Sequence, residues 1–336
     1  MKKKSEILPN NICFITHQLE HLHNVSVSVS FKAGSLYESK YNNGISHLVE
    51  HLFFRQLSDL SQESLYFNMQ KIGGEITGKT YCDYVTFSIN VIPQYLYDAL
   101  DIMLKFFDDF EWSNSIILKE KEVVLRQIEN KAYSYNQWID SIYFENTKYT
   151  LPIMGTKKTV KSLTAFEINS WKKEYFSPAN SCVTITGNFS NEFYDFLKQK
   201  LSIINNFGKK QAPIIEIAPN FTKRNSDNYL TVINADSKLS EVVVLFDIKN
   251  SFDYESVKLI TSILSDGCGS KLSMIMREKY QLTDDIFTYI DFYFSSHKKA
   301  MKYRNPTVSK IKYGDEKKYH YSFYWKQAMS FYKAAK

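Results

Sequence analysis

The chain has few cysteines for its length: Cys13, Cys82, Cys182 and Cys268 are the only four in 336 residues. They lie far apart and form no C-x-x-C pair. The sequence therefore argues against a disulfide-stabilised secreted scaffold and against a cysteine-based zinc site. We expect these residues to be reduced thiols in the core of a cytoplasmic protein.

Long hydrophobic segments are absent as well. No apolar run approaches the roughly 20 residues that a transmembrane helix needs. The N-terminal stretch from Met1 to Glu6 is basic, but no apolar segment follows it as in a secretory signal. We therefore predict no membrane span and a cytoplasmic location.

Positive charge is concentrated at one end of the chain. The formal net charge is +6, yet residues 298–336 alone hold eleven lysines and arginines against Asp315 and Glu316, so the rest is mildly acidic. A basic tail with Tyr, Phe and Trp could contact nucleic acid or a membrane surface. A solvated end of the chain is the more frequent meaning of such a tail, and we predict no nucleic-acid partner.

The pattern of apolar residues predicts blocks of strands and blocks of helices. Residues 25–31 and 80–91 alternate between apolar and polar side chains, which is typical of strands with one buried face. Helical spacing is found at residues 61–72, 94–108, 114–145 and 166–175. Because strands come as neighbours and helices come in runs, the first 205 residues favour an α+β domain over a doubly wound sheet.

One predicted helix, within Gly44–Phe54, carries the pattern H-x-x-E-H. Ser46 is its expected N-cap. His47 and His51 are four residues apart and Glu50 follows His47 by three, so their side chains are predicted to share one helix face. Two imidazoles beside a carboxylate suit a zinc ion with a base, and the pattern is the inverted zincin signature. The five residues alone fit an ordinary polar helix surface equally well.

The later part of the chain shows a weaker version of the same order of elements. We predict a zinc-bearing domain at 1–208, a linker rich in Lys, Asn and Pro at 209–226, and a truncated second repeat at 227–297. A basic aromatic tail at 298–336 follows. The predicted fold is therefore α+β, with two tandem domains.

Several sequence blocks, in one fixed order, resemble a known family. They are Ala33-Gly34-Ser35, the helix 44–54, Gly73-Gly74-Glu75, the helix 120–128, residues 152–156, residues 175–180 and, in the second half, residues 270–282. Over about residues 10–294 the chain resembles the pitrilysin/insulinase metallopeptidases, which include the mitochondrial processing peptidases and bacterial insulinase-like proteins. This order and spacing are far more specific than H-x-x-E-H alone.

The resemblance implies a fold and a metal site. Each domain would be a mixed sheet with helices on one face, and two chains would pair as a clamshell around an unfolded peptide. His47 and His51 would bind Zn²⁺, Glu50 would activate the attacking water, and Glu120 would match a further glutamate of the catalytic site. The resemblance also implies a partner for this chain, which would be a second copy or another family member.

The same resemblance implies where a peptide would bind. The strand that contains Thr77, Gly78 and Lys79 would accept the substrate along its edge as an additional strand. Arg277 would hold the substrate from the second domain.

The sequence departs from the family pattern at two of these positions. The third zinc ligand of the family is a glutamate about 76 residues after the second histidine, and that position is Gln127 here. An amide oxygen is neutral, so Gln127 is either a weak third ligand or the sign of a decayed site; Glu129 would point away from the shared helix face. Asp284 occupies the position of a substrate-binding tyrosine, and a carboxylate there would repel an oxyanion.

Two functions remain open from the sequence. The first is a zinc-dependent endopeptidase that cleaves small unfolded peptides or precursors, with Glu50 as the general base. The second is a non-catalytic family member that binds peptide or serves as a partner subunit.

Overall fold

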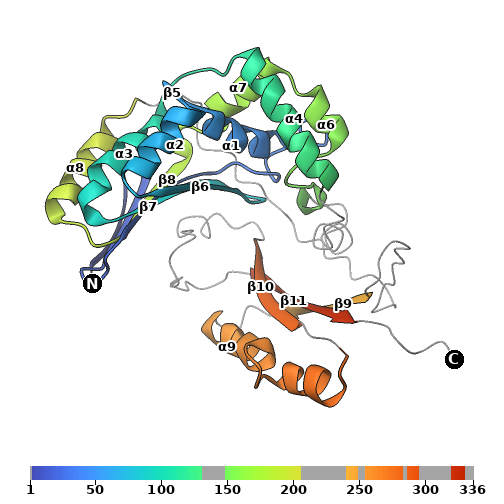
Figure 1. Ribbon diagram of the computed structural model, residues 1–336. Coiled ribbons are helices and arrows are strands. Elements are labelled where there is room, and N and C mark those ends of the chain that lie inside the picture. The colour runs from blue at the N-terminus through green and yellow to red at the C-terminus, as the bar shows by residue number, and fades with distance from the viewer. Residues whose placement is uncertain are drawn as a thin grey trace. The chain divides into compact units, whose positions relative to one another are not determined.

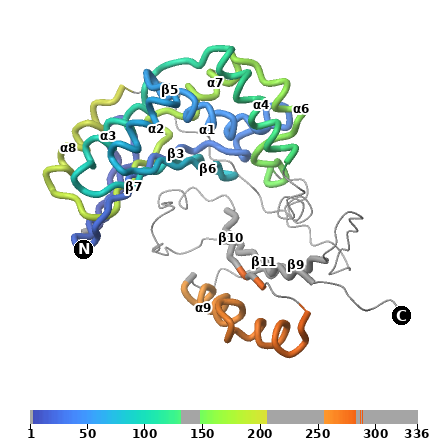
Figure 2. Tube along the Cα trace, viewed as in Figure 1, coloured from blue at the N-terminus to red at the C-terminus, as the bar shows by residue number. Residues whose placement is uncertain are grey.

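The computed structural model describes residues 2–130, 148–205, 240–248, 254–282, 286–294 and 319–329. The chain divides into two compact units, Met1–Ile215 and Glu216–Lys336. The first is coloured from blue to yellow in Figures 1 and 2, and the second is orange to red in Figure 1 and orange in Figure 2, apart from the grey segments. The predicted linker 209–226 lies outside the described residues.

The described part of the first unit holds eight strands and seven α-helices. The strands are β1 (Lys2–Ile7), β2 (Cys13–Gln18), β3 (Val25–Phe31), β4 (Gln56–Leu57), β5 (Leu60–Ser61), β6 (Glu75–Thr80), β7 (Val85–Val91) and β8 (Ser181–Gly187). The helices are α1 (Ile45–Arg55), α2 (Gln62–Lys71), α3 (Leu96–Leu104), α4 (Asn114–Asn130), α6 (Lys157–Ser162), α7 (Ala165–Tyr175) and α8 (Asn191–Ser202).

Six of these strands form one mixed sheet in the order β1-β2-β8-β3-β7-β6. The β2–β8 pair is parallel and the other neighbours are antiparallel. The helices gather over one face of this sheet (Figure 1). The predicted α+β class, with a mixed sheet and helices on one face, is confirmed.

The alternation seen in the sequence decides which face of the sheet is buried. Val25, Val27, Val29 and Phe31 of β3 are almost fully buried under the helices. The serines between them point to the opposite face, where Ser28 bonds to Ser88 and Ser30 donates to Thr86 on β7. That opposite face is consequently polar.

Helix α1 lies against this core through one apolar stripe. Ile45, Leu48, Val49, Leu52 and Phe53 follow helical spacing and are at most 1% exposed. The Phe53 ring lies 5.2 Å from the Phe87 ring of β7 and 5.1 Å from that of Trp112. Because this stripe fixes the rotation of α1, the remaining face of the helix is presented beside α4 and β6.

The second unit has a smaller sheet among its described residues. Its elements are β9 (Ser240–Ile248), α9 (Tyr254–Ser265), a π-helical segment (Ser273–Lys279), β10 (Ile286–Phe294) and β11 (Tyr319–Met329). The three strands are antiparallel in the order β10-β11-β9. Helix α9 is joined to β10 where the Thr288 N–H donates to Ser265 Oγ over 3.1 Å.

The position of β11 differs from the domain limits expected from the sequence. The sequence predicts a tail at residues 298–336, outside the second domain. In the structure, Tyr319–Met329 of this segment is the middle strand of the second sheet. Its sequence lacks a clear period of two, and its partners lie more than 20 residues away, so local pattern alone does not reveal it. Among the described residues no helix has both the length and the apolar composition needed to cross a membrane.

Candidate metal centre

The first turn of α1 is fixed by a buried acid that the sequence analysis did not identify. Glu38 is 1% exposed, and its carboxylate accepts hydrogen bonds from the N–H of Gly44 (2.8 Å) and of Ser46 (2.9 Å) and from the Asn43 side chain (2.8 Å). These bonds satisfy N–H groups that a helix start leaves open. Burial raises the pKa of Glu38, although the same hydrogen bonds act in the opposite direction.

The predicted N-cap at Ser46 is therefore wrong. The N-cap is Gly44, whose φ of 94° suits a glycine, and Ser46 is already inside the helix. The Ser46 hydroxyl instead accepts a hydrogen bond from the Gly34 N–H over 3.1 Å. Ser46 still contributes to the position of α1, but by tying it to the loop after β3.

The two histidines of α1 lie together on the face that the apolar stripe leaves open. Their ring centroids are 4.6 Å apart with an interplanar angle of 70°. The His47 and His51 side chains are 14% and 17% exposed. Half-buried imidazoles at this spacing can serve as two ligands of one metal ion.

His51 is supported by a chain of charged groups. Its Nδ1 lies 2.9 Å from Glu120 Oε1 on α4, and the other carboxylate oxygen of Glu120 accepts a hydrogen bond from the Arg55 guanidinium. Burial alone would raise the pKa of Glu120, but His51 and Arg55 lower it below its ordinary value. An ionised Glu120 accepts a hydrogen bond from the Nδ1–H group of His51, which leaves the Nε2 lone pair available to a metal. The contacts of Glu120 thus assign it to orienting His51.

Glu50 lies between the histidines and the edge of the sheet. Its Oε2 accepts a 2.6 Å hydrogen bond from Thr80 Oγ1 and lies 3.5 Å from His47 Nδ1. Burial raises the pKa of Glu50, but the contacts with His47 and Thr80 and the charge of His51 outweigh it, so the pKa is lowered. Gly78 of β6 leaves room for this carboxylate, since a Cβ there would lie 2.7 Å from Glu50 Oε1.

Gln127, the position that the family resemblance assigns to a third ligand, lies next to His47 in the structure. Its Oε1 is 3.3 Å from His47 Nε2. Two atoms that are each about 2.0–2.1 Å from one tetrahedral zinc ion lie about 3.4 Å apart. Glu129 does not replace it, because that carboxylate pairs with Lys157 at 3.1 Å. Within the described part of the chain no group of three His, Cys, Asp or Glu side chains could hold a metal ion.

The residues predicted to bind substrate fall in both units. Thr77, Gly78 and Lys79 belong to β6, which lies at one end of the strand order and pairs with β7. Arg277 is in the second unit, about half exposed, and lies 3.5 Å from Glu278. Asp284 lies outside the described residues.

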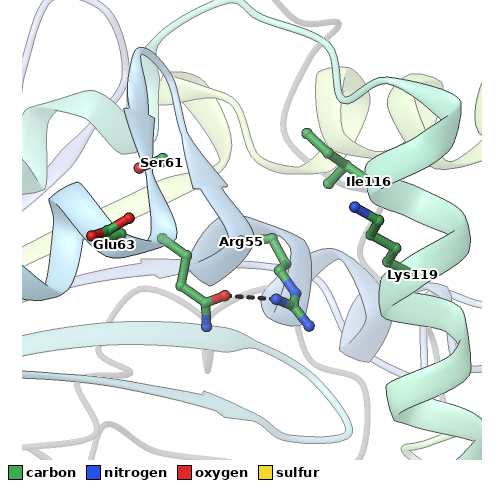
Figure 3. Close-up of a pocket in the computed structure, with 6 residues that line it drawn as sticks. Arg55, Ser61, Glu63, Ile116 and Lys119 are labelled. Atoms are coloured by element: carbon green, nitrogen blue, oxygen red, sulfur yellow. Dashed lines mark hydrogen bonds between the residues drawn. The ribbon is translucent and has the colours of Figure 1, made fainter.

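A pocket of about 320 Å³ lies beside Arg55, between the start of α2 and the first turns of α4 (Figure 3). It is lined by Arg55, Ser61, Gln62, Glu63, Ile116 and Lys119. Arg55 Nη1 donates to Gln62 Oε1 over 2.7 Å, so this arginine connects the wall of the pocket to Glu120. Sequence reasoning missed Arg55, although its position four residues after His51 places it on the same helix face.

Comparison with known proteins identifies the family of this chain. Residues 14–157 match the family described as Insulinase (Peptidase family M16), and residues 162–299 match the family described as Peptidase M16 inactive domain. The chain belongs to peptidase family M16. The predicted membership of the insulinase/pitrilysin family is confirmed.

Individual relatives are distant in sequence. An uncharacterized zinc protease of Bacillus subtilis (strain 168), YmxG, is 25% identical over 190 residues, covering 55% of this chain and 46% of the relative. A Rickettsia bellii (strain RML369-C) protein named as an uncharacterized zinc protease is 22% identical over 297 residues, with 86% and 70% covered. The chain thus spans between about half and 70% of the length of these M16 relatives.

The fold is shared with solved M16 structures. The crystal structure of a protease from Helicobacter pylori superimposes with a TM-score of 0.75 at 18% identity, covering 97% of this chain and 75% of that one. Family membership makes a peptidase-type function the coarse expectation for this chain, while the name of the second matched family shows that M16 also contains inactive domains.

Proposed function

We propose that the chain is a zinc-dependent endopeptidase of family M16 that acts on extended, unfolded peptides. The observation that carries this proposal is the pair of buried carboxylates around the histidines. Glu120 orients His51, and Glu50 is fixed by Thr80 beside His47. Each buried charge has a defined partner, which is what a working metal site requires of the residues around its ligands.

The donors that would hold zinc are His47, His51 and the amide oxygen of Gln127. Two imidazoles and one oxygen match the usual ligand number of a catalytic zinc site, but the oxygen is neutral. Zinc, when bound, lowers the pKa of a water molecule to about 7 and polarises a peptide carbonyl. Because the amide adds no negative charge, we expect zinc to bind more weakly here than with a carboxylate.

Glu50 has the position and the charge of a general base. Its pKa is below the ordinary value, so it is ionised at neutral pH and can accept a proton from the attacking water. Thr80 occupies one carboxylate oxygen and Gly78 leaves space beside the other. Glu50 can subsequently deliver that proton to the leaving amine.

A substrate would pair with β6 as a further strand. Thr77 and Lys79 are exposed, and their side chains point to the polar face of the sheet, while Gly78 is on the side of Glu50. Backbone hydrogen bonds to an edge strand select an extended peptide with little regard to its sequence.

The deciding experiment compares wild type with Glu50→Gln. Wild type loaded with zinc should cleave an unfolded reporter peptide, and Glu50→Gln should lose about 10²–10⁴-fold in rate. Glu122→Gln, the same change at an exposed position of α4, should behave as wild type. Equal activity of wild type and Glu50→Gln would refute the proposal.

A second candidate, a non-catalytic peptide-binding partner subunit, is favoured by one observation. The described residues offer no three charged or imidazole ligands for a metal, because Gln127 replaces the expected carboxylate. Such a subunit would be found with a second copy or another family member and would bind peptide without zinc. A purified monomer that cleaves peptide would exclude it.

A further inference from the structure

Two cysteines that are distant in sequence lie opposite each other in the first sheet. Cys13 of β2 is in register with Cys182 of β8 in the parallel pair. Neighbouring strands lie about 4.7–4.9 Å apart, and a disulfide needs Cα atoms about 4.4–6.8 Å apart. The backbone of both strands therefore already meets the distance condition for a disulfide.

The two thiols also point the same way. Phe14 and Val183, which follow them and are paired with each other, are 1% exposed in the core. Since side chains alternate along a strand, the cysteines project from the polar face, opposite the helices. Both are half-buried thiols on the same face of the sheet.

A lysine completes this cluster. Lys32 follows β3 directly and is fixed beside β8 by two hydrogen bonds. The Lys32 N–H donates to the Asn180 carbonyl (3.1 Å), and the Asn180 side-chain amide donates to the Lys32 carbonyl (3.0 Å). Its ammonium group interacts electrostatically with both sulfurs. A cation beside a thiol is the environment in which a thiolate forms.

The two thiols are not equivalent. The neighbouring Cys182 thiol lowers the pKa of Cys13, and Lys32 acts in the same direction against the effect of burial. The neighbouring Cys13 sulfur, together with burial, raises the pKa of Cys182. These directions favour Cys13 as the thiol that loses its proton first.

We propose that Cys13, Cys182 and Lys32 form a hydroperoxide-reactive dithiol site that closes reversibly into a disulfide between β2 and β8. This site is separate from the candidate metal centre. Disulfides of cytoplasmic proteins are mostly transient and redox-sensing, which fits a pair of this kind.

The reaction follows from the two roles. The Cys13 thiolate attacks one oxygen of the hydroperoxide, the O–O bond breaks, and the departing oxygen takes a proton from Lys32, which leaves Cys13 as a sulfenic acid. The Cys182 sulfur then attacks the Cys13 sulfur, the S–OH bond breaks, and the hydroxide leaves with the Cys182 proton as water. Lys32 regains from solvent the proton that Cys13 released on forming its thiolate. In total the dithiol loses two electrons and two protons, and the hydroperoxide is reduced to an alcohol and water.

The other two cysteines provide internal controls. Cys82 donates to the Asp83 carboxylate at 3.8 Å, and a negative charge there disfavours a thiolate. Cys268 belongs to the second unit and is exposed. Among the described strand pairs, Cys13 and Cys182 are the two cysteines that lie in register with each other.

The test uses the reduced full chain, treated with cumene hydroperoxide in small excess. Titratable thiols should fall from four to two, non-reducing peptide mapping should recover a Cys13–Cys182 cross-link, and dithiothreitol should restore all four. Cys82→Ser and Cys268→Ser should leave the cross-link unchanged. Loss of thiols that dithiothreitol does not reverse, a cross-link between other cysteines, or no loss at all would overturn the proposal.

Single variants test the order of the steps. Cys182→Ser should stop at a Cys13 sulfenic acid that dimedone labels, whereas Cys13→Ser should leave Cys182 unlabelled. Lys32→Met should slow the oxidation by about tenfold, since it removes the cation beside the thiolate, and the exposed Lys40→Met should not. Labelling of Cys182 in Cys13→Ser at the wild-type rate would reverse the assigned roles and refute the assignment. An unchanged rate in Lys32→Met would likewise remove Lys32 from the site.

Discussion

The candidate metal centre has two sides that differ in charge and in support. On the His51 side, His51, Glu120 and Arg55 form a continuous series of charged hydrogen bonds, and the Glu120 side chain is 5% exposed. On the Gln127 side, His47 meets a neutral amide at 3.3 Å on the exposed face of α4. His47 Nδ1 is buried, and its contact with Glu50 Oε2, at 3.5 Å, is longer than the His51–Glu120 contact.

Under the proposed function, this difference places the weaker half of the metal site at Gln127. Keeping the Glu120 carboxylate buried is costly unless it is paired, and the structure pairs it with His51 and Arg55. The Gln127 side carries one negative charge fewer than the family pattern, and Glu129 does not replace it because Glu129 pairs with Lys157. We therefore expect zinc binding to be limited by this one residue.

Gln127→Glu should change the zinc affinity most, because it places a carboxylate beside each of the two histidines. A carboxylate in direct contact with zinc would raise the zinc affinity by about 100-fold or more, given that indirect partners alone change affinity by about 10–100-fold. Peptide cleavage at limiting zinc should rise accordingly. Zinc titration with a competing chelator measures the change.

The control for this variant is Glu122→Gln, which changes an exposed residue of the same helix. If Gln127→Glu left the zinc affinity unchanged, Gln127 would not be a ligand position. The site would then have another cause of weakness, and the non-catalytic alternative would gain support.

Glu120→Gln should lower the zinc affinity, and by less than Gln127→Glu raises it. It removes the charged acceptor of His51 and leaves Arg55 with a neutral partner, so zinc affinity should fall by about 10–100-fold. Adding Glu120→Gln to the Gln127→Glu variant should lower the zinc affinity by the same factor, because the two changes act on different sides of the site. A double-mutant cycle on zinc affinity checks this independence.

Some features of the fold and of the candidate metal centre can be predicted from the sequence alone. The apolar stripe of α1 and the alternation in β3 predict their own burial, because both depend on neighbours along the chain. The position of Gln127 followed from its distance in sequence from His51 together with the family resemblance. Both predictions use spacing, which a sequence displays directly.

The contacts that support the site were less accessible from the sequence. Glu38 fixes the start of α1 from an irregular loop, and local preference favoured Ser46 instead. Arg55 gains its role from Glu120, which is 65 residues away. Strand β11 is placed by pairing across a long separation. Such contacts depend on tertiary structure that no local pattern encodes.

Glu38→Ala tests how much the buried Glu38 carboxylate stabilises the first turn of α1. The variant would leave the buried N–H groups of Gly44 and Ser46 without their acceptor, which should lower the free energy of unfolding by about 2 kcal/mol. Chemical denaturation measures the loss. Glu20→Ala, in an exposed loop, should change little; an equal loss in both variants would show that the capping contact is not what matters.

The smallest expected effect concerns Lys172 of α7, which fixes the segment before α4. Its Nζ donates to the carbonyls of Asp108 and Phe110 and lies 3.4 Å from the centroid of the Phe110 ring. Burial lowers its pKa to about 7, while charges of Asp109 and Asp108 oppose the shift.

An unfolded lysine has a pKa of about 10.4, so between about pH 7 and 10 the unfolded state binds more protons than the folded state. The free energy of unfolding should therefore rise with pH across this window, by about 1 kcal/mol between pH 7 and 8. Lys172→Met should lose that rise, and the exposed Lys173→Met should keep it. If denaturation gave parallel pH profiles for wild type and Lys172→Met, the buried ammonium would have an ordinary pKa. The aromatic ring and the two carbonyls would then stabilise its charge fully, and α4 would be anchored equally well at any neutral pH.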